Sequence, residues 1–77
     1  MEQRTVAALA YRHGQHLVNL FVWPDKTHNE APAKMSSIQG FHLLQWTHSG
    51  MIYKAISDMN PQELTSFREL LLAQSRP

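Results

Sequence analysis

Residues 40–58 read GFHLLQWTHSGMIYKAISD, and this stretch decides the fold. Two runs of aromatic and branched residues flank Ser49 and Gly50, a pattern typical of a β-hairpin with a two-residue loop. Such a loop places Trp46 opposite Tyr53, and the neighbouring pairs become Gln45 with Lys54, Leu44 with Ala55 and Leu43 with Ile56. Each apolar pair contributes roughly 0.2–1 kcal/mol. A loop one residue longer would flip the faces of one strand.

A second hairpin is predicted upstream of this stretch. Residues 16–23, HLVNLFVW, are rich in β-branched and aromatic residues and stop at Pro24, which cannot donate to a β-ladder. Residues 4–12 are ambiguous because alanine favours helix, but the run is short for an isolated helix. A tight turn at His13-Gly14 or Gly14-Gln15 would join the two runs as an antiparallel pair.

Residues 24–39 differ sharply in composition from these strands. They are mostly polar and show a period of neither 2 nor 3.6 residues. We therefore expect a long loop between the two hairpins, either a connector or a functional segment.

A helix is predicted over residues 61–74. Asn60 can cap it, Pro61 suits the first helical position, and Glu63 lies three residues after the cap. The spacing predicts one apolar face that packs into the core, formed by Leu64, Phe67, Leu70 and Leu71.

Together these elements predict one small α+β domain over residues 1–77. The fold is a four-stranded antiparallel sheet, with strands at about 4–12, 16–23, 40–48 and 51–58 and the helix packed across one face. A chain of this size buries only about 60–65% of the surface that its unfolded form exposes, so its core is thin.

Both faces of the predicted sheet carry apolar side chains. In residues 16–23, Val18, Leu20 and Val22 oppose Leu17, Phe21 and Trp23, and a single helix covers only one face. We expect the other face to be an interface, either between two copies of the chain or with sequence outside it. The residues expected to form it are Leu17, Phe21, Trp23, Leu44, Trp46 and Tyr53.

Composition argues against several classes of protein. The net charge is +1, with seven basic and six acidic residues dispersed along the chain, so no basic stripe is available to bind nucleic acid. Cysteine is absent, which excludes disulfides and thiolate metal sites. No apolar run approaches the roughly 20 residues of a membrane helix, and no signal-peptide core follows the start. The chain is then either a cytoplasmic protein or a piece of a longer one.

Five histidines raise the possibility of a metal site, at positions 13, 16, 28, 42 and 48. His42 and His48 share a strand face but are separated by roughly 20 Å. His13 and His16 bracket a turn and could chelate with a third ligand, but no carboxylate cluster accompanies them. Ser49 beside His48 lacks the elbow of a nucleophilic serine. We expect no catalytic residue, no cofactor and no native metal.

Four stretches considered together resemble a known family. These are residues 6–12 (VAALAYR), 16–24 (HLVNLFVWP), 40–46 (GFHLLQW) and 50–58 (GMIYKAISD). They resemble the C-terminal, extracytoplasmic part of bacterial transmembrane anti-sigma factors that restrain extracytoplasmic-function sigma factors. The similarity spans residues 5 to about 72, and the NLFVWP run followed by GMxYxAxSD is its most specific part.

The resemblance implies a three-part membrane regulator. A cytoplasmic segment would bind the sigma factor, one membrane helix would follow, and this domain would lie on the periplasmic side of the inner membrane. The sequence carries neither of the first two parts, and Lys54 stands where the family is expected to have an aromatic residue. The family usually has a further strand-like segment upstream of Thr5; without it an open edge would favour a homodimer or a strand-exchanged oligomer.

The sequence therefore leaves three alternative functions. The first is a periplasmic sensory or regulatory module that acts by protein–protein contact. The second is a small cytoplasmic oligomeric ligand-binding protein without enzymatic activity. The third is a metal-binding module that uses His13 and His16.

Overall fold

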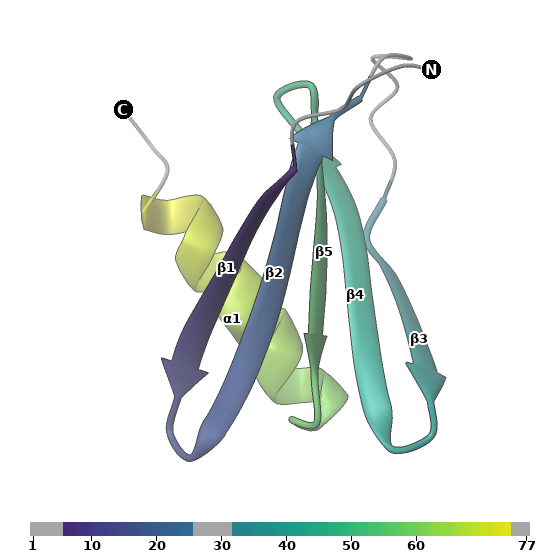
Figure 1. Cartoon of the computed structure of the whole chain (residues 1–77), viewed down its shortest axis with the longest axis vertical. Helices are drawn as coiled ribbons and strands as arrows, with labels where there is room; N and C mark the ends of the chain where they lie inside the picture. The colour runs from purple at the N-terminus through teal and green to yellow at the C-terminus, as the bar shows by residue number, and fades with distance from the viewer. Residues whose placement is uncertain (1–5, 26–31, 75–77) are drawn as a thin grey trace.

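The computed structural model describes residues 6–25 and 32–74, which form five strands and one helix (Figure 1). Residues 4 and 5 of the first predicted strand, His28 within the predicted loop, and the end of the chain lie outside these residues. The elements are β1 (Ala7–His13), β2 (His16–Pro24), β3 (Lys34–Ile38), β4 (Phe41–His48), β5 (Met51–Ser57) and α1 (Pro61–Gln74).

The strands form one antiparallel sheet in the order β1-β2-β5-β4-β3. The α+β class is confirmed, but the predicted count of four strands is wrong, because β3 lies inside the segment expected to be a loop. Gln39 and Gly40 both adopt positive φ, at 49° and 85°, as the type I′ turn of a two-residue hairpin requires. The turn folds β3 back onto β4 and pairs Ile38 with Phe41.

The predicted register of the central hairpin is confirmed. Trp46 pairs with Tyr53, Gln45 with Lys54, Leu44 with Ala55, and Leu43 with Ile56. Ser49 and Gly50 form the two-residue loop with φ values of 53° and 76°. The predicted hairpin of β1 and β2 also forms, around Gly14 and Gln15.

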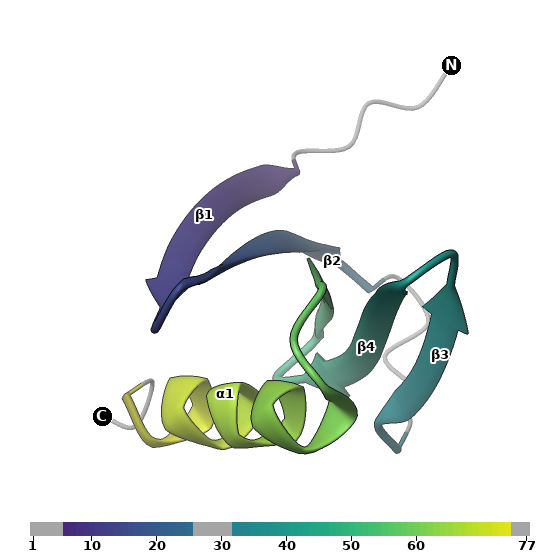
Figure 2. The same ribbon diagram turned by 90° about the horizontal axis from the view of Figure 1, so that it is seen from below.

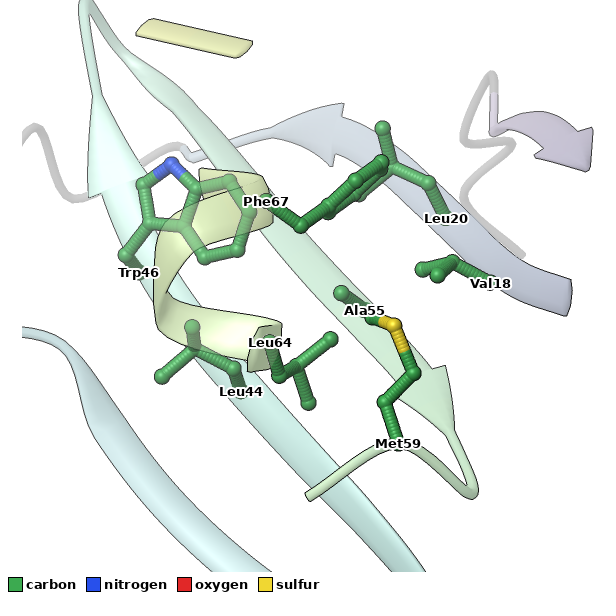
Figure 3. Close-up of a cluster of buried hydrophobic side chains, with 8 residues drawn as sticks. All are labelled: Val18, Leu20, Leu44, Trp46, Ala55, Met59, Leu64 and Phe67. Atoms are coloured by element: carbon green, nitrogen blue, oxygen red, sulfur yellow. The ribbon is translucent and has the colours of Figure 1, made fainter. Parts of the chain in front are cut away.

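The helix α1 lies against one face of the sheet (Figure 2). Between the two layers lies a cluster of buried side chains, shown in Figure 3: Val18, Leu20, Leu44, Trp46, Ala55, Met59, Leu64 and Phe67. Trp46 stacks on Tyr53 with ring centroids 5.2 Å apart, and the guanidinium of Arg68 lies 5.5 Å from the Trp46 ring. The core is thus formed by β2, β5 and β4 against a single helix.

The start of α1 agrees with its predicted capping residue, because the backbone N–H of Glu63 donates to Asn60 Oδ1 at 2.8 Å. Of its predicted core face, Leu64 and Phe67 are buried and Leu71 packs against the cluster. The prediction for Leu70 is wrong, since its side chain is 52% exposed. Leu70 lies about 60° further round the helix than Phe67, beyond the line of contact with the sheet.

No helix in the part of the chain that the structure describes is long and apolar enough to span a membrane.

Candidate protein-interaction surface

The face of the sheet opposite α1 is the candidate site, and Figure 1 looks directly onto it. Paired residues in an antiparallel ladder point to the same face, so the register assigns each side chain to one face. We call this surface the open face. Its apolar side chains are Leu17, Phe21, Trp23, Ile38, Phe41, Leu43, Ile52 and Ile56.

No described helix or strand covers the open face as α1 covers the opposite one, and of the residues outside the sheet Val6 borders it. Leu17, Ile38 and Phe41 are 53%, 64% and 50% exposed, and the other five apolar side chains are half-buried against one another. Singly exposed apolar residues are common on proteins, but here apolar side chains lie on four adjacent strands, on both sides of a polar row formed by Lys54, Gln45 and Lys34. A surface with so many apolar side chains is a candidate contact site.

The structure places the predicted interface residues on both sides of the sheet, and the prediction for β4 and β5 is wrong. Leu17, Phe21 and Trp23 lie on the open face, whereas Leu44 and Trp46 are 3% and 1% exposed beneath α1. Tyr53 stacks on Trp46 and is half-buried on the same helix-covered side. These three residues therefore belong to the core.

The reason for the error is the strand order. β5 lies between β2 and β4, and Phe21 pairs with Lys54, which pairs in turn with Gln45. The odd-numbered residues of β4 therefore share a face with Phe21, which brings Phe41 and Leu43 to the open face. The sequence shows that alternate residues of β4 and β5 point to opposite faces of the sheet. Only the pairing of β5 with both β2 and β4 shows which of the two sets faces α1.

One end of the open face forms a hollow of about 410 Å³, lined by Val6, Phe21, Trp23, Lys54 and Ile56. Four of these side chains are apolar, and Lys54 provides one ammonium group among them. The hollow is shallow and open to solvent, unlike the small-molecule pockets that bury most of their ligand. It is shaped to receive an apolar side chain from a partner or one end of a small apolar ligand.

The open face carries basic side chains on its strands and one carboxylate, Asp58, at its end. Lys54 lies at its centre, Lys34 flanks it beyond Gln45, and Arg12 lies on β1. Asp58, directly after β5, is exposed beside Leu17, Phe41 and Ile56 at one end of the face, where it contacts His16. An apolar surface bordered by ammonium and guanidinium groups is complementary to a partner that presents apolar and carboxylate side chains.

The other end of the open face is connected to the entrance of α1 by a small polar network. Ser57 Oγ donates to the Leu17 carbonyl at 2.8 Å and accepts from the Met59 N–H at 3.1 Å. His16 Nδ1 and Asp58 Oδ1 lie 2.9 Å apart on the protein surface. These contacts fix Leu17 of the open face relative to the start of the helix.

The histidines and Ser49 do not assemble into a chemical site. His13 lies edge-on to Phe67, His16 contacts Asp58, and His42 Nδ1 lies 2.7 Å from Ser37 Oγ. Ser49 is a turn residue with positive φ, and His48 is exposed at the end of β4. Within residues 6–25 and 32–74 no group of three or more His, Asp or Glu side chains is placed to hold a metal ion.

Comparison with known protein families, with curated proteins and with solved structures finds no match for this chain.

Proposed function

We propose that this domain is a non-enzymatic regulatory module that acts by protein–protein contact through the open face. The observation that supports this most strongly is the set of apolar side chains on the open face of four adjacent strands, with Leu17, Ile38 and Phe41 each at least half exposed. The partner surface is apolar and carries carboxylates that lie against Lys54 and Lys34, away from Asp58 at the end of the face.

We further propose, from the sequence resemblance, that the module is the periplasmic part of a transmembrane anti-sigma factor. In this assignment a cytoplasmic segment that precedes the domain binds the sigma factor, and a membrane helix connects the two. Binding of a partner to the open face would alter the stability of the domain and its accessibility to proteolysis, and thereby the release of the sigma factor.

The test uses the membrane-anchored protein in cells with a reporter for sigma-dependent transcription. Phe21→Lys and Phe41→Lys each place a charge on the open face and should change transcription at rest or under envelope stress. Gln62→Lys, on the exposed side of α1, is the matched control and should leave both levels unchanged. Deletion of the whole domain with no effect on transcription under either condition would refute the assignment.

The reading frame provides an independent check. The proposal requires a membrane helix encoded upstream of Met1 and a sigma-factor gene beside it. A frame without that helix would contradict the membrane assignment and leave the contact function standing.

The hollow beside Phe21 and Trp23 favours a second candidate, a small oligomeric protein that binds an apolar ligand. Trp23 lines the hollow, so a ligand there should change the indole fluorescence. Titration with an uncharged apolar dye such as Nile red tests this, with Phe21→Lys as the variant expected to abolish binding. A dye response that Phe21→Lys leaves intact would exclude the hollow as the ligand site.

A further inference from the structure

The two edges of the sheet differ in how they are protected against pairing with another chain. β3 forms one edge; it is five residues long and carries Lys34, Ser36 and Ser37. Short, polar and charged edge strands are the usual protection against further pairing. β1 forms the other edge, with seven residues and no lysine or proline.

β1 is regular along its whole length. Its seven residues pair one-to-one with β2 from His13↔His16 to Ala7↔Val22, without a bulge that would twist the edge away. Residues 7–10 are all exposed, and three of them are alanines. Small side chains allow another backbone to approach closely.

The outward hydrogen-bonding groups of β1 follow from the hairpin geometry. In a two-residue hairpin the residues that flank the loop, here His13 and His16, exchange both backbone hydrogen bonds. The groups of Tyr11, Leu9 and Ala7 then also point toward β2. The N–H and C=O groups of Ala8, Ala10 and Arg12 point outward, and no described strand pairs with them.

From this edge we infer a second interaction surface, distinct from the open face, at which β1 pairs antiparallel with β1 of a second copy. Several registers let the outward N–H and C=O groups of the two β1 strands bond to one another. The register that places Ala10 opposite Ala10 of the partner pairs all seven residues. It places Leu9, which is 45% exposed, opposite Tyr11 of the partner.

The same register explains why a second copy suits this edge. Arg12, the only charged residue of β1, faces Ala8 of the partner, so no like charges lie opposite one another. Centring the pairing on Arg12 would oppose two guanidinium groups, and centring it elsewhere would pair fewer residues. The result is a two-fold symmetric, ten-stranded sheet whose two open faces lie on the same side.

The test exploits the symmetry at Ala10. Ala10→Lys places two lysines opposite one another and Ala10→Glu places two glutamates, so each variant alone should raise the dimer dissociation constant by about fivefold or more. An equimolar mixture should form a heterodimer at least as tight as the original. The mass is measured by light scattering over a range of concentrations, with a monomer of 8.9 kDa as reference.

Three further measurements make the outcome decisive. Gln62→Lys is the control for added charge, and Phe41→Ser removes an open-face contact; both should remain dimeric through β1. Amide hydrogen exchange at Ala8, Ala10 and Arg12 should be slow in the dimer and fast in the Ala10 variants, whose β2 and β5 amides stay protected. A monomer at every concentration, or a dimer whose dissociation constant neither Ala10 variant raises, would overturn the inference.

Discussion

At the scale of single residues, Ser57 links the sheet to the helix. Its side chain is 2% exposed and bonds both the Leu17 carbonyl and the Met59 N–H. Its buried hydroxyl therefore satisfies two backbone groups from segments that are distant in sequence. Met59, the next residue but one, is itself fully buried.

Replacing Ser57 with alanine should lower the free energy of unfolding by about 1–3 kcal/mol, because the Leu17 carbonyl and the Met59 N–H lose their partner. Urea unfolding followed by circular dichroism measures the change. Ser66→Ala, on the exposed side of α1, is the control and should be nearly neutral. Equal stabilities of the two variants would show that water replaces the hydroxyl at no cost.

Two features at the residue scale could be predicted from short stretches of sequence. The capping contact of Asn60 and the pairing of Trp46 with Tyr53 depend on neighbours only a few residues away in the sequence. Cap preference and hairpin loop length express such short-range geometry, so both could be predicted from residue types alone.

At the scale of elements, α1 is attached to the sheet mainly through Leu64 and Phe67. Phe67 lies edge-on to Tyr11 at 5.3 Å between ring centroids, and thus joins β1 to the helix. Leu70, three residues further on, is largely exposed. The two residues have similar apolar character and opposite structural roles.

Phe67→Ala should therefore cost about 3–5 kcal/mol of stability, whereas Leu70→Ala should change it by about 0.5 kcal/mol or less. Thermal and urea unfolding of the two variants give the comparison. For so small a domain the first change approaches global unfolding. A similar loss for both variants would mean that Leu70 is buried in solution, for example by a second copy.

β3 is the element that sequence reasoning missed. Its residues KMSSI show no apolar alternation, because the two apolar residues, Met35 and Ile38, are three positions apart and point to opposite faces. What stabilises the strand is its ladder with β4, together with the turn at Gln39 and Gly40. A residue such as Gln39 in the left-handed region carries only a weak sequence signal, because asparagine and glycine are the residues usual at that position.

At the scale of the whole molecule, α1 covers one apolar face of the sheet, and no other described helix or strand covers the opposite one. Ile38 and Phe41 pair across the β3–β4 turn at one corner of the open face. They are 64% and 50% exposed, so they contribute little to the stability of the single chain. Their exposed apolar surface is available for contact with other molecules, under the function proposed above.

Replacing both Ile38 and Phe41 with serine should change the free energy of unfolding by less than about 1 kcal/mol. It should also reduce the binding of an apolar dye and any association through the open face. Chemical unfolding and dye fluorescence together provide the measurement, with Phe67→Ala as the contrasting core variant. A large loss of stability would place these two side chains in a core and contradict the contact function.

Much of this architecture was determined by the sequence alone: the α+β class, the central hairpin with its register, the hairpin of β1 and β2, and the capped helix. Each rests on interactions between residues near one another in the chain, which periodicity and turn chemistry express directly. The presence of two apolar faces on β2 also follows from alternation. Only the tertiary structure decided that β5 lies between β2 and β4, and therefore that Leu44, Trp46 and Tyr53 face α1 while Leu43 and Phe41 do not. The physical reason is that alternation makes two faces equally apolar, and which of them the helix covers depends on packing between segments distant in sequence.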